Sequence, residues 1–143
     1  MKNSNFNPHN KLSIIRIAPV CNGKIYVVPH AGSNQMDLPL MKYTDSYSRK
    51  TCNKTAKLFT ENYKEFTTSE EPRFSVRYIS PVDKEEFVYL YILPLNNEDE
   101  VVFNEGKFIS ADDIENNQHL YSEYLQKESG LLGMAAELWR DYL

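Results

Sequence analysis

The chain has 143 residues and a formal net charge of −4, a length that suits one domain with a single continuous core. Hydrophobic residues make up 41% and charged residues 25% of the sequence, which is typical of a globular protein and not of a disordered one. The acidic balance argues against a nucleic-acid polymer as the partner, because phosphate backbones require a basic protein face.

Cysteine and histidine usage exclude further classes of site. Cys21 and Cys52 are too few for a disulfide scaffold and lack the spacing of metal ligands. His9, His30 and His119 stand alone, so we interpret them as solvated or capped residues. No segment approaches the roughly 18 to 20 apolar residues of a membrane span, and the start lacks the apolar core of a signal peptide. We therefore expect a cytoplasmic protein that does not bind a membrane.

The N-terminal part of the sequence predicts a β-hairpin. Residues 1–10 are rich in Asn and are predicted to be a flexible lead-in to a domain over residues 11–143. Two β-branched runs then flank Asn22-Gly23, a dipeptide that favours the tight turn of a hairpin. Pro19 lacks a backbone donor, which predicts an edge strand or a bulge at that point. Residues 31–48 are expected to form a loop with a short extended piece over 36–40.

A helix is predicted from about Ser48, where Asp45, Ser46 and Ser48 offer N-cap side chains. Apolar residues recur at alternating intervals of four and three along one stripe of an amphipathic helix: Cys52, Ala56, Phe59, Tyr63 and Phe66. The sequence TTSEEP then ends the helix.

Two strands follow, a half-exposed one over 73–80 and an almost wholly apolar one over 86–95. An acidic loop with a short central strand leads to a further strand at 107–109 and a short helix from Ala111, capped by Ser110. The remainder is predicted to be helical in two parts, with inward-facing apolar residues at Leu120, Tyr124, Leu125, Leu132, Ala135, Ala136, Trp139 and Leu143. With ten tyrosines in the chain, much of the core must consist of rings that keep one polar edge.

The order of these elements predicts one α/β or α+β sandwich, and several landmarks resemble the Nudix hydrolase superfamily. GKIYVVPH is similar to that family's second strand, MDLPL to its Leu-Pro step, and FVYLYILPL to its buried strand. KFISADDIEN resembles its Trp-containing segment, with Phe108 in place of the tryptophan. The resemblance covers roughly residues 12–143 and implies a single-domain Nudix-like α/β/α sandwich with a mixed sheet.

The family's chemistry resides in the Nudix box, a helix whose glutamates hold Mg²⁺ or Mn²⁺ against a diphosphate. The best register places KLFTENYK on the motif REUxEExG, with Lys57 at the arginine, Leu58 at the first glutamate, Glu61 and Asn62 at the paired glutamates and Lys64 at the glycine. Upstream, Tyr43 and Arg49 take the places of the first glycine and the early glutamate, and Leu40 and Met41 follow Pro39 where the family has two glycines.

Only one of the three helix carboxylates that the resemblance implies is therefore present. Mg²⁺ requires several hard oxygen ligands in near-octahedral array, whereas Leu58 offers none and Asn62 only a neutral amide. Glu61 has two interpretations, a solvated carboxylate paired with Lys57 or Lys64, or a weak cation site shared with Glu65 one helical turn beyond.

Three hypotheses for the function follow. The first is a Nudix-like domain without hydrolase activity that senses a ligand or binds a protein. A phosphorylated small molecule would meet Arg49, Lys50, Lys54 and Lys57, near Glu61, Asn62 and Glu65, whereas a protein partner would contact exposed tyrosines such as Tyr43 and Tyr47. These tyrosines have an alternative interpretation as loop anchors on the core.

The second hypothesis is an active pyrophosphohydrolase of nucleoside diphosphate derivatives that requires Mg²⁺ or Mn²⁺. It would use displaced carboxylates, for which the acidic loop offers Glu98, Asp99, Glu100 and Glu105. The third is a structural subunit or homodimer. The sequence identifies neither a substrate nor a partner.

Overall fold

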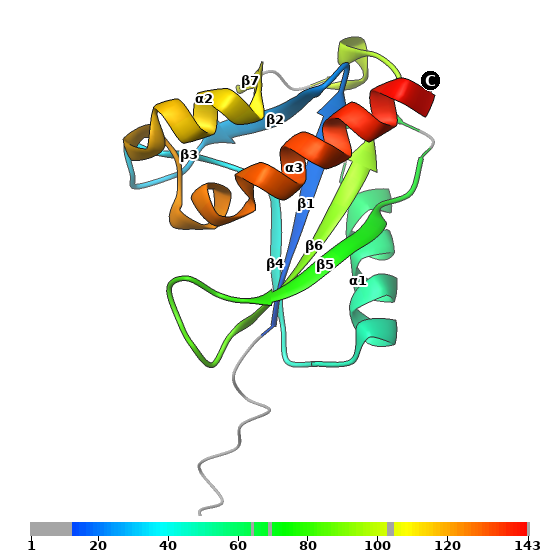
Figure 1. The fold of residues 1–143 in the computed structure, drawn as a ribbon. Coiled ribbons are helices and arrows are strands. Elements are labelled where there is room, and N and C mark those ends of the chain that lie inside the picture. Colours follow the sequence, from blue (N-terminus) through cyan, green and yellow to red (C-terminus); the bar gives the residue numbers. More distant parts are fainter. Residues whose placement is uncertain (1–12, 64, 69, 103–104, 143) are drawn as a thin grey trace, which may run out of the picture.

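The protein is an α/β/α sandwich in which a mixed sheet lies between one helix on one face and two helices on the other (Figure 1). This computed structural model describes residues 13–142 except 64, 69 and 103–104. The helices are α1 (Arg49–Glu61), α2 (Ala111–Asn116) and α3 (Glu123–Tyr142), with short 3₁₀ turns η2 (Glu98–Glu100) and η3 (Gln118–Leu120). The strands are β1 (Ser13–Cys21), β2 (Lys24–Pro29), β3 (Met36–Asp37), β4 (Leu40–Thr44), β5 (Arg73–Ile79), β6 (Phe87–Pro94) and β7 (Lys107–Ile109).

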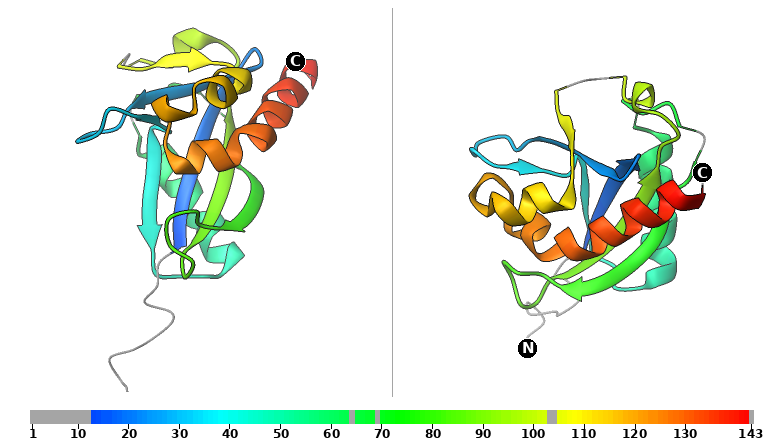
Figure 2. Two further views of the ribbon diagram at one scale, coloured as in Figure 1. Left: turned by 60° about the vertical axis from the view of Figure 1, so that its left-hand side comes forward. Right: turned by 45° about the horizontal axis from the view of Figure 1, so that its top comes forward.

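The expected fold class, an α/β/α sandwich with a mixed sheet, is confirmed, and α1 lies on the opposite face from α2 and α3 in both views of Figure 2. The predicted lead-in over residues 1–10 lies outside the described residues. Of the described helices, none combines the length and apolarity that a membrane crossing requires.

Strand β1 is the centre of the sheet. It pairs in parallel with β6 along its length, and its other edge pairs antiparallel first with β4, from Ser13 to Ile17, and then with β2, at Val20 and Cys21. The prediction that Pro19 marks an edge strand or a bulge is therefore wrong. Pro19 instead lies where β1 passes from one partner to the next, so that the ladder on that edge needs no donor from it.

The hairpin between β1 and β2 is confirmed at Asn22-Gly23. Both residues have positive φ, 53° at Asn22 and 79° at Gly23, and Cys21 pairs with Lys24 directly across the turn. In contrast, the predicted loop over residues 31–48 contains more strand than expected, because β4 extends to Thr44. The reason is tertiary, since β1 supplies the open edge with which β4 pairs.

Helix α1 starts as predicted, with the Oγ of Ser48 accepting a hydrogen bond from the N–H of Thr51 at 3.3 Å. It ends at Glu61, earlier than the apolar stripe suggested. Tyr63 and Phe66 nevertheless reach the same core as Cys52 through the turn that follows, and their rings stack with centroids 5.4 Å apart. The prediction that the helix continues through Phe66 is wrong, because packing of the two rings does not require helical backbone.

The inward face of α3 is confirmed at Tyr124, Leu125, Leu132 and Ala136, which are buried, while Ala135 is half-buried. Leu120 contradicts the prediction because 41% of its surface is exposed. It ends η3, and the next residue, Tyr121, takes the buried position instead. The side chains of Trp139 and Leu143 lie outside the described part of the chain.

Strand alternation divides the buried side chains between the two faces of the sheet. Ile15 and Ile17 of β1 face α1, whereas Ile14 and Ala18 face the side of α2 and α3. The α1 side is rich in rings and confirms the expectation of a core built from tyrosines with satisfied polar edges. The hydroxyl of Tyr91 donates to Asn53 at 2.6 Å, and that of Tyr89 donates to the carbonyl of Tyr47.

The α3 side instead contains a buried ion network. The guanidinium of Arg16, on β1, donates to both carboxylate oxygens of Glu128 and to Asp37, each at 2.8 Å. Tyr78 donates to Glu128 at 2.5 Å, and the ring of Tyr124 lies 4.6 Å from the guanidinium carbon. Burial by itself lowers the pKa of Arg16, but the charges and hydrogen bonds of Glu128 and Asp37 outweigh it, so the pKa is raised. The network ties α3 to the sheet.

Candidate functional site

The residues that the resemblance aligns with the glutamate-bearing end of the Nudix box, 57–62, lie at the C-terminal end of α1, beside a surface depression of about 210 Å³. Lys57, Thr60 and Glu61 of α1 form one wall. The rest is lined by the segment that links α1 to β5, namely Tyr63, Phe66, Thr68, Glu70, Glu71 and Pro72. The depression is shallow and open to solvent on the Glu61 side, since Glu61 itself is exposed.

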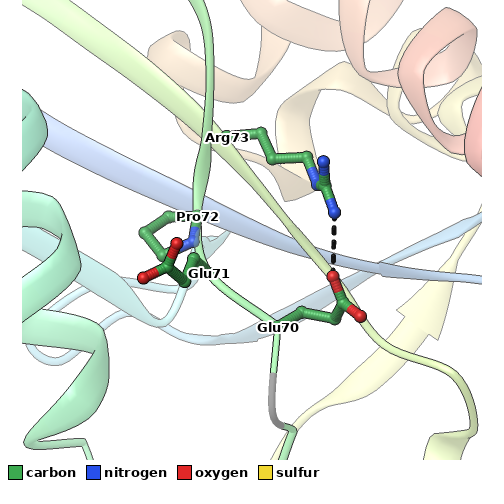
Figure 3. A pocket seen from close by; sticks show the side chains of 4 residues that line it. All are labelled: Glu70, Glu71, Pro72 and Arg73. Atoms are coloured by element: carbon green, nitrogen blue, oxygen red, sulfur yellow. Dashed lines mark hydrogen bonds and ion pairs between the residues drawn. The ribbon is translucent and has the colours of Figure 1, made fainter.

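Ion pairs neutralise most of the charges around this depression. The Nζ of Lys57 lies 3.0 Å from a carboxylate oxygen of Glu71, and Arg73 pairs with Glu70 at 2.8 Å. Figure 3 shows the two glutamates pointing to opposite sides of their loop, so that the Arg73–Glu70 pair lies away from Glu71. Glu71, and to a smaller degree Glu61, raises the pKa of Lys57. Glu61 is left without an ion-pair partner among the described residues.

Glu70 and Glu71 are residues that sequence reasoning missed. Their signal was the acidic pair in TTSEEP, which was interpreted only as a helix terminator. Thr68 helps to hold this loop, because its hydroxyl donates to the carbonyl of Pro94 and accepts from the N–H of Glu70. The interpretation that Glu61 pairs with Lys57 is wrong because Lys57 pairs with Glu71, and Lys64 lies outside the described residues.

The helix positions that the resemblance assigns to glutamates hold side chains of a different kind. Leu58 is 47% exposed on the outer face of α1. Asn62 is the C-cap of the helix, where its side-chain amide donates to the carbonyl of Leu58 at 2.9 Å. Asn62 therefore stabilises the helix end, and its neutral oxygen is the only ligand atom that its side chain could still offer a cation.

The suggested cation site shared by Glu61 and Glu65 rested on one continuous helix, and that premise is wrong. Glu65 lies beyond the end of α1, in a segment whose backbone binds the acidic loop, with its carbonyl accepting from the N–H of Val102 at 2.7 Å. Among the described residues, no three His, Cys, Asp or Glu side chains come together in the arrangement of a metal site. The residues present therefore do not fit the divalent ion that the resemblance implies.

Four basic residues of α1 were predicted to meet a phosphorylated ligand, and the structure separates them. Arg49 turns toward the sheet, with its guanidinium carbon 4.3 Å from the ring centroid of Phe74, and Lys57 is paired with Glu71. Lys50 and Lys54 are exposed on the outer face and form no ion pair with any described residue. The four charges are therefore spread along and around the helix and do not surround one anion.

The acidic loop forms a separate feature. Glu98 and Asp99 border a different depression, of about 450 Å³, together with Tyr26, Lys107 and Phe108. Glu100 caps η2, since its carboxylate accepts from the N–H of the N-cap residue Asn97 at 3.3 Å, and also from the N–H of Asn96 at 2.6 Å. The structure does not bring these carboxylates together with Glu61 in one depression. Glu105 is exposed and directly follows residues 103–104, which lie outside the described part of the chain.

The two tyrosines proposed for partner contact differ from each other. Tyr43 is 53% exposed, on β4. Tyr47 is half-buried and packs edge-on against Phe87, with ring centroids 5.6 Å apart, as expected for a loop anchor. An apolar depression of about 670 Å³ also borders α3, where Met134 and Leu138 are exposed. It is lined by none of the α1 residues.

The upstream positions of the resemblance also depart from a tight glycine loop. Leu40 and Met41 lie in β4, which pairs with β1 up to Thr44 opposite Ser13. This chain therefore forms regular strand pairs at the positions where the family has its glycines. Residues with a Cβ fit a strand, but they do not fit the strained turn that glycines allow.

No known family profile matches the sequence, and no curated protein matches it either. Similarity emerges only between folds. A mutT/nudix family protein from Listeria innocua superposes with a TM-score of 0.59 at 13% identity, over 93% of this chain and 98% of that chain. Other matched structures are described as a NUDIX family hydrolase from Clostridium perfringens and as a putative Nudix hydrolase.

Two further similar structures have other descriptions. The C-terminal domain of mouse MUTYH, in a complex with human PCNA, matches with a TM-score of 0.59 at 9% identity, over 88% of this chain and 89% of that chain. A putative oxidoreductase from Sinorhizobium meliloti matches with a TM-score of 0.55 at 10% identity, over 90% of this chain but only 41% of that chain. At such low identities the similarity concerns the fold alone. Together with the element order, these similarities show that the chain has a Nudix-like fold.

Proposed function

We propose that the protein is a Nudix-like domain without hydrolase activity and that it acts by binding a protein through the exposed face of α1. One observation carries this proposal. At the two positions where the resemblance expects metal-binding glutamates beside Glu61, the helix has an exposed Leu58 and a helix-capping Asn62.

The chemistry of the available donors supports a non-hydrolytic role. Mg²⁺ takes near-ideal octahedral geometry and is bound through carboxylates and substrate phosphates. At this site Glu61 is the one carboxylate without an ion pair among the described residues, since Glu70 and Glu71 each have a cationic partner. A divalent ion would have to displace Lys57 or Arg73 before it gained a second carboxylate. Binding of a divalent ion is therefore expected to be weak.

The distribution of charge favours a protein over a phosphorylated small molecule as the ligand. A phosphate is bound best where several donors converge on it. Here Arg49 stacks on Phe74 and Lys57 pairs with Glu71, so among the described basic residues of α1 only Lys50 and Lys54 have neither an aromatic ring nor a carboxylate as a partner. Their neighbour Leu58 adds exposed apolar surface, as expected for a protein contact.

Hydrolase activity is the decisive test of this proposal. Purified protein is incubated with Mg²⁺ or Mn²⁺ and a panel of nucleoside diphosphate derivatives, with release of phosphate or nucleoside monophosphate as the readout. We expect no turnover above that of the blank. Mn²⁺-dependent turnover that disappears in Glu61→Gln would overturn the proposal and support the active hydrolase. The matched control is Glu115→Gln, which makes the same change at an exposed residue of α2.

A thermal-shift panel of phosphorylated metabolites tests the ligand-sensing alternative. A ligand at one hundred times its dissociation constant stabilises a protein by about 2.7 kcal/mol, which is readily measured. We expect no such shift. A shift that is lost in a K50E/K54E variant would assign the same face to a small phosphorylated ligand and would contradict the preference for a protein.

A further inference from the structure

The outer face of α1 carries a row of side chains that we call the α1 stripe, which consists of Lys50, Lys54, Lys57, Leu58 and Glu61. Lys50, Lys54 and Leu58 follow one another at four-residue spacing, and Lys57 and Glu61 adjoin them, so all five lie on one side of the helix. All five are exposed. The opposite side, with Cys52, Ala56 and Thr60, is buried.

The α1 stripe is positive in an otherwise acidic chain. Helix α1 has four basic residues and one acidic residue, so its formal charge is +3, and the rest of the chain must carry −7 to give the net charge of −4. The first turn of the helix contains Arg49 and Lys50 but no acidic residue. Cations there oppose the helix dipole, so helix stability does not explain this arrangement.

The charge of the α1 stripe changes from positive to negative along the helix. Lys50 and Lys54, which form no ion pair with a described residue, lie in its first half, and Glu61 lies at its end. Further carboxylates follow beyond that end, because the backbone after α1 holds the acidic turn η2. The N–H of Thr67 donates to the carbonyl of Glu100 at 2.9 Å, and that of Val102 donates to Glu65. Glu98 and Asp99 of this turn are exposed, and Figure 1 shows η2 beyond the upper end of α1.

We infer that the α1 stripe is a homodimer interface, with two copies related by a two-fold axis near Leu58. A surface that runs from positive to negative is its own complement when a second copy lies antiparallel to it. A two-fold interface uses the same patch on both subunits, so each favourable contact occurs twice. This inference rests on the proposed function, for which it names the partner.

The helix geometry sets the contacts of such a dimer. With Leu58 facing its counterpart at the axis, Lys54 of one copy lies at the level of Glu61 and Asn62 of the other. Lys50 lies one turn further out, about 6 Å along the helix from Lys54, toward the acidic turn η2. Contact between the two leucines would remove the exposed apolar side chain from water, and Lys50 and Lys54 would each gain an acidic partner.

Sedimentation equilibrium at several protein concentrations tests the inference. At low ionic strength we expect a mass of twice 16.7 kDa at the highest concentrations. Raising the ionic strength from about 0.1 M to about 1 M shortens the Debye length from about 10 Å to about 3 Å, and should raise the dissociation constant about tenfold. A mass of one chain at every concentration and at low salt would overturn the inference.

Charge reversal provides a test that does not depend on the wild-type affinity alone. K54E and E61K should each be monomeric, because each places like charges opposite one another twice. An equimolar mixture of the two should recover the dimer, since each altered side chain then meets an opposite charge. A mixture that stays monomeric, while the wild type forms dimers, would reject this register of the interface.

Matched controls exclude effects of charge or hydrophobicity as such. Lys127→Glu makes the K54E change at an exposed lysine of α3, on the other side of the sheet, and should leave the dissociation constant unchanged. Leu58→Asp should abolish the dimer, whereas Leu120→Asp, at a leucine of similar exposure in η3, should not. Circular dichroism of each variant confirms its folding. Equal losses in the α1 variants and in the controls would overturn the inference.

Failure of this inference and failure of the proposed function give different results. A monomeric protein without Mn²⁺-dependent turnover would retain the non-hydrolytic role and reject only the second copy as the partner. A dimer with turnover that Glu61→Gln removes would retain the interface and reject the non-hydrolytic role.

Discussion

The two faces of the central sheet are both covered by helices, yet different interactions hold those helices in place. On the α1 side, aromatic rings are prominent. Tyr26 packs against both Phe66 and Phe108, and the hydroxyls of Tyr89 and Tyr91 donate to a loop carbonyl and a helix side chain. The α3 side instead has a mainly aliphatic core and the buried Arg16, which is bound by Asp37 and Glu128 and lies against the ring of Tyr124.

This difference separates the charges that maintain the fold from those available for contacts with other molecules. The charges under α3 are withdrawn from water, and each has a partner. The charges on α1 are exposed, and the ion pair there joins side chains of which more than half is accessible to solvent. A buried ion loses much when its partner is removed, whereas an exposed one is simply solvated. We therefore expect mutations to act very differently on the two faces.

The largest effect is expected from Arg16→Met, which leaves two carboxylates buried without their cation. Breaking a buried ion pair in this way costs about 3 to 5 kcal/mol, so the free energy of unfolding, measured by urea titration, should fall by that amount. Arg77→Met, at an exposed arginine of β5, is the control and should have little effect. A loss of less than about 1 kcal/mol in Arg16→Met would remove the distinction between the two faces.

A second variant replaces all three charged residues of the Arg16 network and so provides a sharper test. R16M/D37L/E128M removes the three charges that Arg16, Asp37 and Glu128 bring into the core, and replacement of a buried ion network by apolar residues is often neutral or stabilising. We expect this variant to be more stable than Arg16→Met alone. If it were less stable, packing around Arg16 would matter more than its charge.

A smaller effect is expected from Tyr78→Phe, which removes the hydroxyl that donates to Glu128. A hydrogen bond to a charged group contributes about 1.5 to 3 kcal/mol, and the loss should appear in the same urea titration. Tyr43→Phe, at an exposed tyrosine, should leave the free energy of unfolding unchanged.

The hydroxyl of Tyr78 also predicts that the free energy of unfolding depends on pH in the alkaline range. Burial and then the charge of Glu128 raise the pKa of Tyr78 above its ordinary value of 10.0, and burial likewise raises the pKa of Tyr91 and Tyr124. In the unfolded chain these groups lose their protons near pH 10, but in the folded protein they keep them. The contribution of these protonated tyrosines to the free energy of unfolding is therefore complete below pH 10 and declines as the pH rises above it. Tyr78→Phe should show a shallower decline, and an identical one would contradict this assignment.

The smallest effect is expected from Lys57→Ala on the α1 face. Its partner Glu71 is more exposed than Lys57 itself, and both side chains become solvated when the pair is broken. We expect no measurable change in the urea midpoint, and the same for Glu71→Ala. A loss comparable to that of Tyr78→Phe would show that the charged loop before β5 is part of the folded framework.

Local patterns in the sequence were sufficient for much of the fold. Asn22-Gly23 predicted the hairpin, Ser48 the start of α1, and Ser110 the start of α2, because each of these signals acts through hydrogen bonds or φ angles of neighbouring residues. The contrast between the half-exposed strand β5 and the buried strand β6 was also evident from their alternation.

The errors have a common cause in contacts between distant residues. Tyr63 and Phe66 continue the apolar spacing of α1 although the helix has ended, because the core accepts their rings from a turn. Pro19 looked like the mark of an edge, whereas β1 is central and changes partners at that point. No local pattern announces which strand will pair with which.

The candidate site also divides into features that local sequence patterns predict and contacts that depend on distant residues. The sequence alone was enough to place Leu58 and Asn62 where the resemblance expects carboxylates. It did not indicate that Asn62 caps the helix, that Glu71 takes Lys57 as its partner, or that Glu65 leaves the helix and joins the acidic loop. Each of these contacts depends on where α1 ends and where the loop before β5 returns.

The sequence by itself determined the order of the elements, most of their boundaries and the scarcity of carboxylates on α1, since these depend on residue type and spacing within a short segment. Only the tertiary structure decided that the isolated Arg16 has two carboxylate partners, from β3 and α3, and that the lysines of α1 do not converge. The physical reason is that charge interactions depend on distance and burial in space, and the residues that supply them here are up to 112 positions apart in the chain.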